Sequence, residues 1–280
     1  MTSSAALAGH TFRPFSALFR VAAVASALIL AGCVGRDELV VEQAIPAADL
    51  YAEGIAAYET QRYGDAIDAF AELDRRYPYS EQGRRGLILL ADAQYNLSRW
   101  EEAIASAERY LLLYGNGDDA DQALFLIGEA YLRQVPDVTR DQGAARRGLA
   151  ANQELVERFP NSAFVEQARL NMVAVNDQLA GQEMLVGRYY QERRDYVAAI
   201  NRFRLVVEEY GDTRHVEEAL FRLTETYLAM GLVGEAQTAA AVLGHNFPNS
   251  PWYQQAFNLL GAGGLQPRRG GGWLGGQFRN

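Results

Sequence analysis

The chain has 280 residues and a formal net charge of −9. A protein that binds nucleic acid phosphates needs a basic face, so this charge argues against a nucleic-acid partner. All 26 basic residues are arginines, which excludes mechanisms that need a lysine, such as a Walker-type phosphate site or a Schiff base. Alanine, leucine, glutamate and arginine are abundant while proline is sparse, and this balance favours helices. The composition therefore predicts an acidic, all-α protein.

The first 32 residues have the layout of a signal peptide. Residues 1–20 contain two arginines and no acid, and residues 21–30 are ten apolar or small side chains. Ten residues are too few to span a bilayer but fit the apolar core of a signal. The run Leu-Ala-Gly before Cys33 resembles a bacterial lipoprotein lipobox. We therefore expect residues 1–32 to be a lipoprotein signal peptide and Cys33 to carry a lipid with acyl chains such as palmitate.

An ordinary secretory signal with an incidental cysteine is the alternative. Val34 follows the cysteine, whereas lipoproteins retained in the inner membrane typically have aspartate there. The expected location is therefore the periplasmic face of the outer membrane, with the chain anchored by lipid. Residues 33–48 are predicted to be the lipidated cysteine and a linker.

From residue 49 onward the sequence repeats a pattern of small residues. In four of five copies an alanine follows the small residue after twelve positions, and a proline or glycine follows after twenty-four. This spacing resembles the tetratricopeptide repeat, in which two antiparallel helices approach closely at small side chains. We therefore predict a superhelical solenoid of five tetratricopeptide-like helix pairs, about ten helices in all. The small residues that begin the five copies are Gly54, Ala91, Gly128, Gly187 and Thr224.

The interval between the third and fourth copies is 59 residues, whereas the others are 37. The excess predicts a loop insertion after residue 133 and a long helix from Ala163 to Arg193, about 45 Å in length. This helix would divide repeats 1–3 (49–162) from repeats 4–5 (163–260). The third copy has Gly148 and Asn152 where alanine and phenylalanine would be regular, so the repeat pattern does not predict how its two helices pack. Ser80, Ser162 and Ser250 are predicted helix caps, and the Gly-rich residues 261–280 are predicted to be a disordered tail.

The sequence offers little for catalysis. The three histidines lie far apart and have no cysteine or histidine at ligand spacing, so we expect no metal site, and no cofactor or catalytic residue is predicted. Acid pairs fall at predicted helix starts, where carboxylates favour the helix dipole. Paired-carboxylate chemistry, as in a peptidoglycan lyase, is the enzyme alternative. Groove positions in the first three repeats are aromatic and mildly acidic, which suits an extended aromatic-rich peptide, or else these aromatics simply pack between repeats.

Three stretches carry a more specific resemblance: "ELDRRYPYS" (72–80), "EMLVGRYYQERRDYVAAINRFRLVVEEYGDT" (183–213) and "ALFRLTETYLAMGL" (219–232). Together with the lipobox and the five repeats, they resemble the BamD family, lipoproteins of the β-barrel assembly machinery of the bacterial outer membrane. The resemblance implies a non-enzymatic adaptor that binds unfolded outer-membrane β-barrel proteins through its N-terminal repeats. It also implies docking on a POTRA domain of BamA through the C-terminal repeats, alongside other lipoproteins of the machinery.

The resemblance also suggests which residues act. For the unfolded substrate the candidates are Tyr58, Tyr77, Tyr79, Tyr95 and Arg99. For BamA they are Tyr189, Arg193 and Arg202, with the two arginines pairing to carboxylates of the POTRA domain. The alternative function is a periplasmic tetratricopeptide scaffold that regulates cell division or peptidoglycan synthesis. Such scaffolds typically begin with a coiled coil, and no sustained heptad pattern precedes residue 49.

Overall fold

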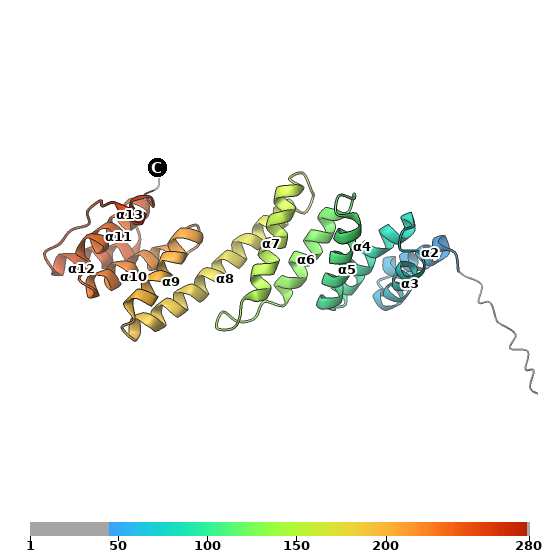
Figure 1. The fold of residues 1–280 in the computed structure, drawn as a ribbon, viewed down its shortest axis with the longest axis horizontal. Helices are drawn as coiled ribbons and strands as arrows, with labels where there is room; N and C mark the ends of the chain where they lie inside the picture. The colour runs from blue at the N-terminus through green and yellow to red at the C-terminus, as the bar shows by residue number, and fades with distance from the viewer. Residues whose placement is uncertain (1–44, 279–280) are drawn as a thin grey trace, which may run out of the picture. The chain divides into compact units, whose positions relative to one another are not determined.

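The computed structural model describes residues 45–278, and the chain divides into units 1–44 and 45–280. The predicted signal peptide, Cys33 and most of the linker therefore lie outside the described residues. Within the described residues every regular element is a helix (Figure 1). The helices are α2 (Ala47–Glu59), α3 (Tyr63–Arg76), α4 (Glu81–Asn96), α5 (Trp100–Tyr114), α6 (Ala120–Arg133), α7 (Gly143–Arg158), α8 (Val165–Glu192), α9 (Tyr196–Glu209), α10 (Val216–Ala229), α11 (Val233–Asn246), α12 (Pro251–Ala262) and α13 (Gly272–Gly275).

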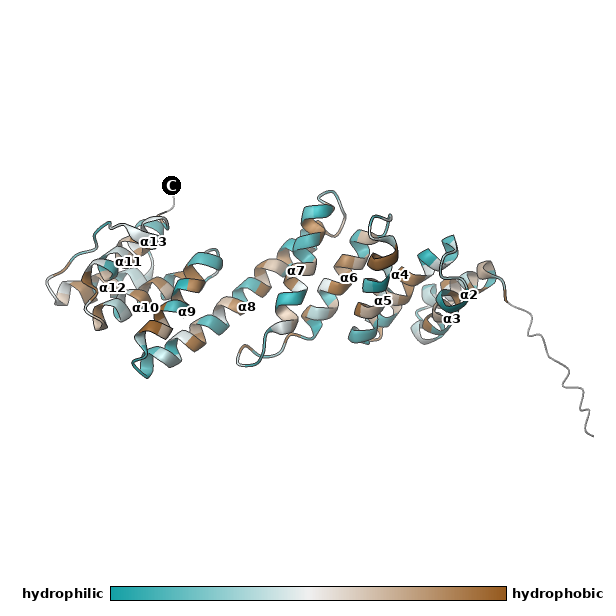
Figure 2. Ribbon diagram, in the orientation of Figure 1, coloured by the Kyte–Doolittle hydropathy of each residue, from teal (hydrophilic) through white to brown (hydrophobic). Residues whose placement is uncertain are grey.

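The predicted five helix pairs are confirmed as α2–α3, α4–α5, α6–α7, α8–α9 and α10–α11, and they form a tetratricopeptide-like solenoid. The second helix of each pair also packs on the first helix of the next pair. The described part holds two helices more than the ten expected, because α12 packs on α10 and α11, and α13 on α11. Apolar and polar residues alternate around the helices, as amphipathic packing requires (Figure 2).

Small residues at the crossing points explain why the helices pair. A Cβ atom on Gly54 would lie 2.4 Å from the ring of Phe70, and one on Gly187 would lie 2.4 Å from the ring of Phe203. The alanines twelve positions later are fully buried: Ala66, Ala103, Ala199 and Ala236. Because a larger side chain at these positions would push the helices apart, the repeat spacing specifies the pairing.

The third pair keeps this close approach with different chemistry. A Cβ atom on Gly128 would lie 2.5 Å from the side-chain nitrogen of Asn152, which occupies the place of Phe70 and Phe203 in other pairs. Gly148 lies against the backbone of Gly128, where a Cβ would be 3.2 Å from the carbonyl oxygen. The irregular residues therefore pack in register, with an amide in place of an aromatic ring.

The long helix is present as α8, with 28 residues and a length of about 42 Å. Its N-terminal part packs on α6 and α7, and its C-terminal part on α9, so it belongs to both halves of the repeat array. Ser80 and Ser250 accept backbone N–H groups of α4 and α12 as predicted caps. Ser162 is not the cap residue of α8, which begins at Val165 with Phe164 at the cap position. Its hydroxyl accepts the backbone N–H of Phe164 at 3.2 Å and donates to Asp121 at 2.6 Å.

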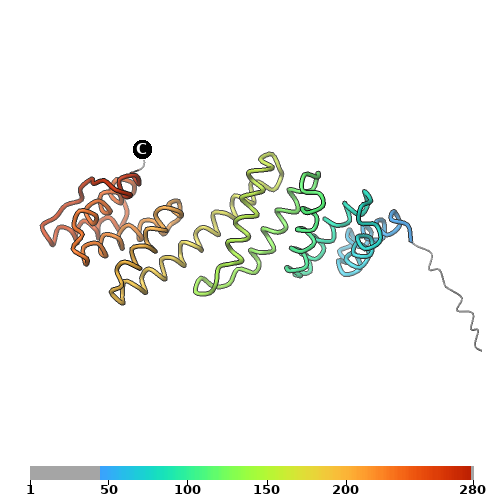
Figure 3. The backbone as a smooth tube through the Cα atoms, in the orientation of Figure 1, coloured from blue at the N-terminus to red at the C-terminus, as the bar shows by residue number. Residues whose placement is uncertain are grey.

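The prediction of a disordered C-terminal tail over residues 261–280 is wrong for residues 261–278, of which the first two end α12. After α12 the chain turns back along α11 (Figure 3), and Leu274 is only 2% exposed. Leu274 joins the apolar core built by α8 to α12, with Trp273 and Phe278 packed against it. Composition misled the prediction, since glycine-rich segments bury little surface on average, whereas here Leu274, one of two leucines in the Gly-rich stretch, is buried in a pocket.

Candidate interaction surfaces

The first helices of successive pairs lie side by side and are joined by side-chain hydrogen bonds in a constant register. The hydroxyl of Tyr58 on α2 donates to Asp92 on α4. The hydroxyl of Tyr95 on α4 donates to Glu129 on α6 at 3.2 Å, again 34 residues further on. Aromatic and acidic side chains of the first three pairs therefore lie together on one surface. We call the surface formed by α2, α4 and α6 the N-terminal groove face.

Both tyrosines act as hydrogen-bond donors within this face. Burial, then the hydrogen bond to Asp92, raises the pKa of Tyr58 well above its usual value. Burial also raises the pKa of Tyr95, while the guanidinium of Arg133 opposes that shift and Glu129 adds to it. The hydroxyls therefore stay protonated, and each holds a carboxylate of the neighbouring helix in place.

Glu129 is the centre of a polar network that enters the third pair. It accepts from Tyr95 and from the amide of Asn171 on α8, at 2.6 Å, and its side chain is 13% exposed. Arg133 donates to the Tyr95 hydroxyl at 3.1 Å. The buried Asn152 connects to Asn171 at 3.5 Å and donates to the Gly148 carbonyl at 2.8 Å. Sequence reasoning missed Asn171; the asparagine at a core position of the third repeat was the available signal.

The five residues predicted to bind substrate do not form one site. Tyr58 and Tyr95 lie on the N-terminal groove face, whereas Tyr77 and Tyr79 lie in the turn between α3 and α4. Tyr77 donates to the Ile45 carbonyl at 2.9 Å. Tyr79 is 83% exposed. Arg99 precedes α5, pairs with Glu102 at 3.6 Å and lines a cleft beside Trp100 of about 260 Å³.

The three residues predicted to bind BamA separate in the same way. Tyr189, near the end of α8, is 49% exposed, and the Arg193 guanidinium lies over its ring at 4.5 Å. Arg202 on α9 instead pairs with Glu183 of its own chain at 3.0 Å, and the Glu183 side chain is 9% exposed. Tyr189 and Arg193 therefore form an exposed cation–aromatic pair, while Arg202 already has a carboxylate partner.

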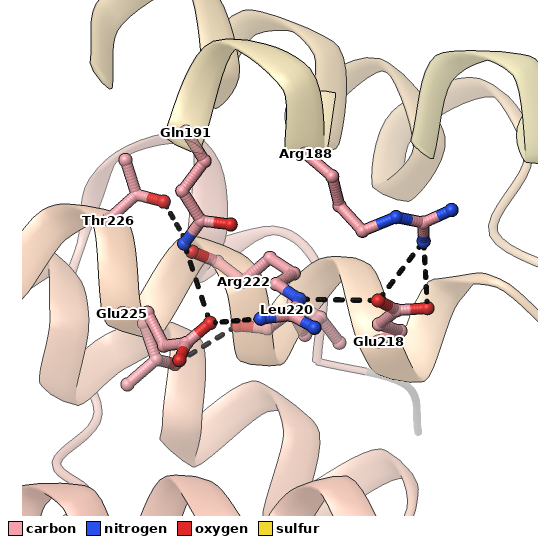
Figure 4. A network of polar contacts seen from close by, with 8 residues as sticks. Arg188, Gln191, Glu218, Leu220, Arg222, Glu225 and Thr226 are labelled. Atoms are coloured by element: carbon pink, nitrogen blue, oxygen red, sulfur yellow. Dashed lines mark hydrogen bonds and ion pairs between the residues drawn. The ribbon is translucent and has the colours of Figure 1, made fainter. Parts of the chain in front are cut away.

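The C-terminal half has its own polar network between α8 and α10 (Figure 4). Arg188 lies 3.1 and 3.2 Å from the two carboxylate oxygens of Glu218. Arg222 bonds both Glu218 and Glu225, and Gln191 donates to Glu225 at 3.4 Å in the register of Tyr58 and Tyr95. Two guanidinium groups here match two carboxylates, whereas in the N-terminal half the phenol of Tyr58 faces Asp92. The contact between α2 and α4 thus uses a phenol, whereas the contact between α8 and α10 uses a guanidinium group.

A family model described as "YfiO: Outer membrane lipoprotein" matches residues 43–243. The chain belongs to this family. It is 42% identical over 88% of its length to the outer membrane protein assembly factor BamD of Caulobacter vibrioides, and the match covers 82% of that protein. The BamD of Rickettsia prowazekii is 33% identical, with 83% of this chain and 92% of the relative covered. Among solved structures, a thermophilic TPR protein of Thermus thermophilus covers 75% of this chain and 98% of its own, at 20% identity and a TM-score of 0.38.

The YfiO match contains all eight predicted binding residues within repeats 1–5 and ends inside α11. Helices α12 and α13 and the segment between them lie beyond it. Across residues 45–278 of this YfiO family member, no helix is long and apolar enough to cross a membrane.

Proposed function

We propose that the chain is a non-enzymatic lipoprotein adaptor of outer-membrane protein assembly. In this proposal it binds unfolded β-barrel proteins and docks on BamA through a POTRA domain. Two relatives named outer membrane protein assembly factor BamD, each matched over more than four-fifths of both chains, support the proposal. The observation that carries it to specific residues is the contrast between an aromatic, acidic N-terminal groove face and an exposed cation–aromatic pair at the end of α8.

The N-terminal groove face suits an extended polypeptide segment. Tyr58 packs edge-on against Tyr63 at 5.5 Å, and Tyr95 packs against Trp100 at 5.1 Å, so partly exposed ring surface accompanies carboxylate acceptors. A strand from an unfolded barrel protein brings apolar aromatic side chains and backbone N–H donors, which match both features. Binding would cover apolar side chains that otherwise promote aggregation of the unfolded chain.

This substrate role is tested by titrating a fluorescent peptide from the last strand of a barrel protein into the purified chain. Truncation of Tyr95 to alanine is expected to weaken peptide binding by about tenfold. The reason is the loss of one aromatic contact worth about 1.4 kcal/mol, which corresponds to a tenfold change in affinity. Tyr95→Phe keeps the ring and removes the bond to Glu129, and so separates packing from the hydrogen bond. Leu112→Ala is the matched control, since Leu112 is 85% exposed on α5, outside the groove face. Equal affinity for wild type and Tyr95→Ala would remove the groove face from the proposal.

Docking on BamA is assigned to Tyr189 and Arg193, with Arg202 as a supporting residue. The exposed guanidinium of Arg193, held over the Tyr189 ring, can pair with a carboxylate of a POTRA domain without first leaving an internal partner. Arg193→Glu is expected to weaken binding to the BamA periplasmic domains while leaving helicity unchanged. Arg169→Glu makes the same charge change near the other end of α8 and is expected to bind as wild type. Binding losses of equal size in both variants would point to overall charge instead of a docking site.

Lipid attached to Cys33 would confine the adaptor to the membrane surface and raise its effective concentration near BamA. More than one acyl chain anchors stably, whereas a single chain binds only marginally. The whole proposal is tested by purifying the tagged, lipidated chain from its own outer membranes in mild detergent and identifying what accompanies it. Recovery of a POTRA-containing barrel protein near one-to-one supports assembly. Recovery of cell-division or peptidoglycan-synthesis proteins instead would favour the periplasmic scaffold function.

A further inference from the structure

Residues 265–278 form a strap that runs along α11 and is held at both ends. Near its start the backbone N–H of Arg268 donates to the Gln237 carbonyl at 3.2 Å, and the Gln237 side chain donates back to the Gln266 carbonyl at 2.8 Å. Near its end, Asn246 donates to the Gln277 carbonyl at 2.7 Å. These bonds use mainly the backbone of the strap, so α11 presents polar side chains to an extended segment, as peptide-binding surfaces do.

The middle of the strap is recognised through its side chains. Leu274 is buried in the core cluster of the last two repeats. The indole N–H of Trp273 lies 3.4 Å from the Tyr227 hydroxyl on α10, and the Arg204 guanidinium on α9 lies 4.9 Å from the centre of the indole. Three helices thus contribute to one seat for an adjacent Trp–Leu pair, which combines an apolar pocket, a hydrogen-bond acceptor and a cation.

The seat also selects for glycine before that pair. A Cβ atom on Gly270 would lie 2.3 Å from the Thr238 hydroxyl oxygen, so a larger residue would lift the strap from α11. Gly272 has a φ of +70°, a conformation that residues with a side chain rarely adopt. The chemistry accepted by the seat is therefore a glycine-rich segment followed directly by Trp–Leu, with the pair in the helical turn α13.

The strap is bound in a way that allows exchange. Five of its fourteen residues are glycine, and ordering glycine costs more conformational entropy than ordering other residues. Leu274 is its one fully buried side chain among the described residues. A cleft of about 350 Å³, lined by Gly234, Glu235, Thr238 and residues 270–274, remains between strap and helix. An interface with this much free space and one buried anchor is weaker than the packing between the helices.

We propose that the last two repeats carry a second peptide-binding surface, and that the strap is its tethered, displaceable occupant. The ligand it fits is a partner segment of the same chemistry, a glycine-rich stretch with an adjacent Trp–Leu pair. The surface is formed by α9, α10 and α11, lies away from the N-terminal groove face, and does not depend on the proposed function. The match to the family model ends at residue 243, so the strap lies beyond the matched region.

The test uses the full chain with Trp273→Ala and Leu274→Ala, which removes the anchor in the short helix α13 and leaves the sequences of α2 to α12 unchanged. A fluorescent peptide of residues 265–278 is titrated into this variant and into wild type. We expect the variant to bind the peptide at least tenfold more tightly, because in wild type the tethered strap competes at an effective concentration in the millimolar range. A peptide with alanine at both anchor positions is the control and is expected not to bind.

Equal affinity of the peptide for variant and wild type, or no binding to a variant of normal helicity, overturns the proposal. If the double variant loses helicity, the same titration with Gly270→Val decides, since that change lifts the strap without touching the core anchor. Sedimentation of the wild-type chain at rising concentration tests whether the seat binds the strap of a second copy. A dimer that the double substitution abolishes would show that the seat accepts the strap of a second copy, which overturns the assignment to a partner.

Discussion

Replacing Arg202 is expected to weaken the contact between α8 and α9 before it affects any partner. The Arg202 guanidinium lies 3.0 Å from the carboxylate of Glu183, whose side chain is 9% exposed, while the Arg202 side chain is 43% exposed. A hydrogen bond between charged groups contributes about 1.5–3 kcal/mol, and exposure of one partner places this pair near the lower limit. Arg202→Ala should therefore cost about 1.5 kcal/mol.

For a domain of this size, 1 kcal/mol corresponds to about 2–4 °C in melting temperature, so Arg202→Ala should melt about 3–6 °C lower. Arg202→Glu should be worse, at about 3 kcal/mol, because it places a second carboxylate beside Glu183. Because stability in repeat arrays is carried by contacts between neighbours, the loss should be concentrated in α8 and α9.

The assay is a thermal melt followed by circular dichroism, with hydrogen exchange to locate the loss. Glu183→Gln combined with Arg202→Ala should recover most of the stability, since it removes the unmatched charge, and the double-mutant cycle isolates the coupling. Melting of Arg202→Ala at the wild-type temperature would refute the reasoning. It would mean that the pair of Arg202 and Glu183 contributes little to the stability of the folded chain.

Two further outcomes are expected. Gly187→Leu should destabilise by about 1–3 kcal/mol in urea unfolding, since its side chain would enter the ring of Phe203. Gly64→Ala, with open space around its Cβ, should stabilise the protein slightly, and equal effects would contradict the close-approach argument. Burial lowers the pKa of His215 despite the nearby Asp177, so the folded state disfavours the charged form. Stability from this group is complete above its unfolded pKa of about 6.5 and is lost as the pH falls through the lowered value, whereas His215→Gln should show a flatter dependence of melting temperature on pH.

The repeat spacing predicted the helix pairs and the long helix because it reports a local requirement. Small residues such as Gly54 and Ala66 are needed where two helices cross closely. Their spacing of twelve positions is therefore visible in the sequence wherever such a crossing occurs. The long helix followed in the same way, from the excess of the third interval, with ends within two residues of those observed.

The candidate site was predictable only in part. Tyr58 and Tyr95 occupy equivalent positions on α2 and α4, as the repeat spacing predicts, because register within a repeat is periodic. Their hydrogen bonds to Asp92 and Glu129 were not predicted, since they depend on how adjacent pairs sit against each other. The pairing of Arg202 with Glu183 depends on the same geometry, and its partner lies 19 residues earlier on another helix.

The sequence by itself determined an all-α chain of paired helices and the positions of its crossing points, since helix formation and close approach depend on residues near one another in sequence. The tertiary structure alone decided which charged and hydroxyl groups are already paired, and that Leu274 and Trp273 bind the last two repeats. The physical reason is that burial of one leucine depends on a pocket made by distant helices, a property that neither glycine content nor local pattern contains.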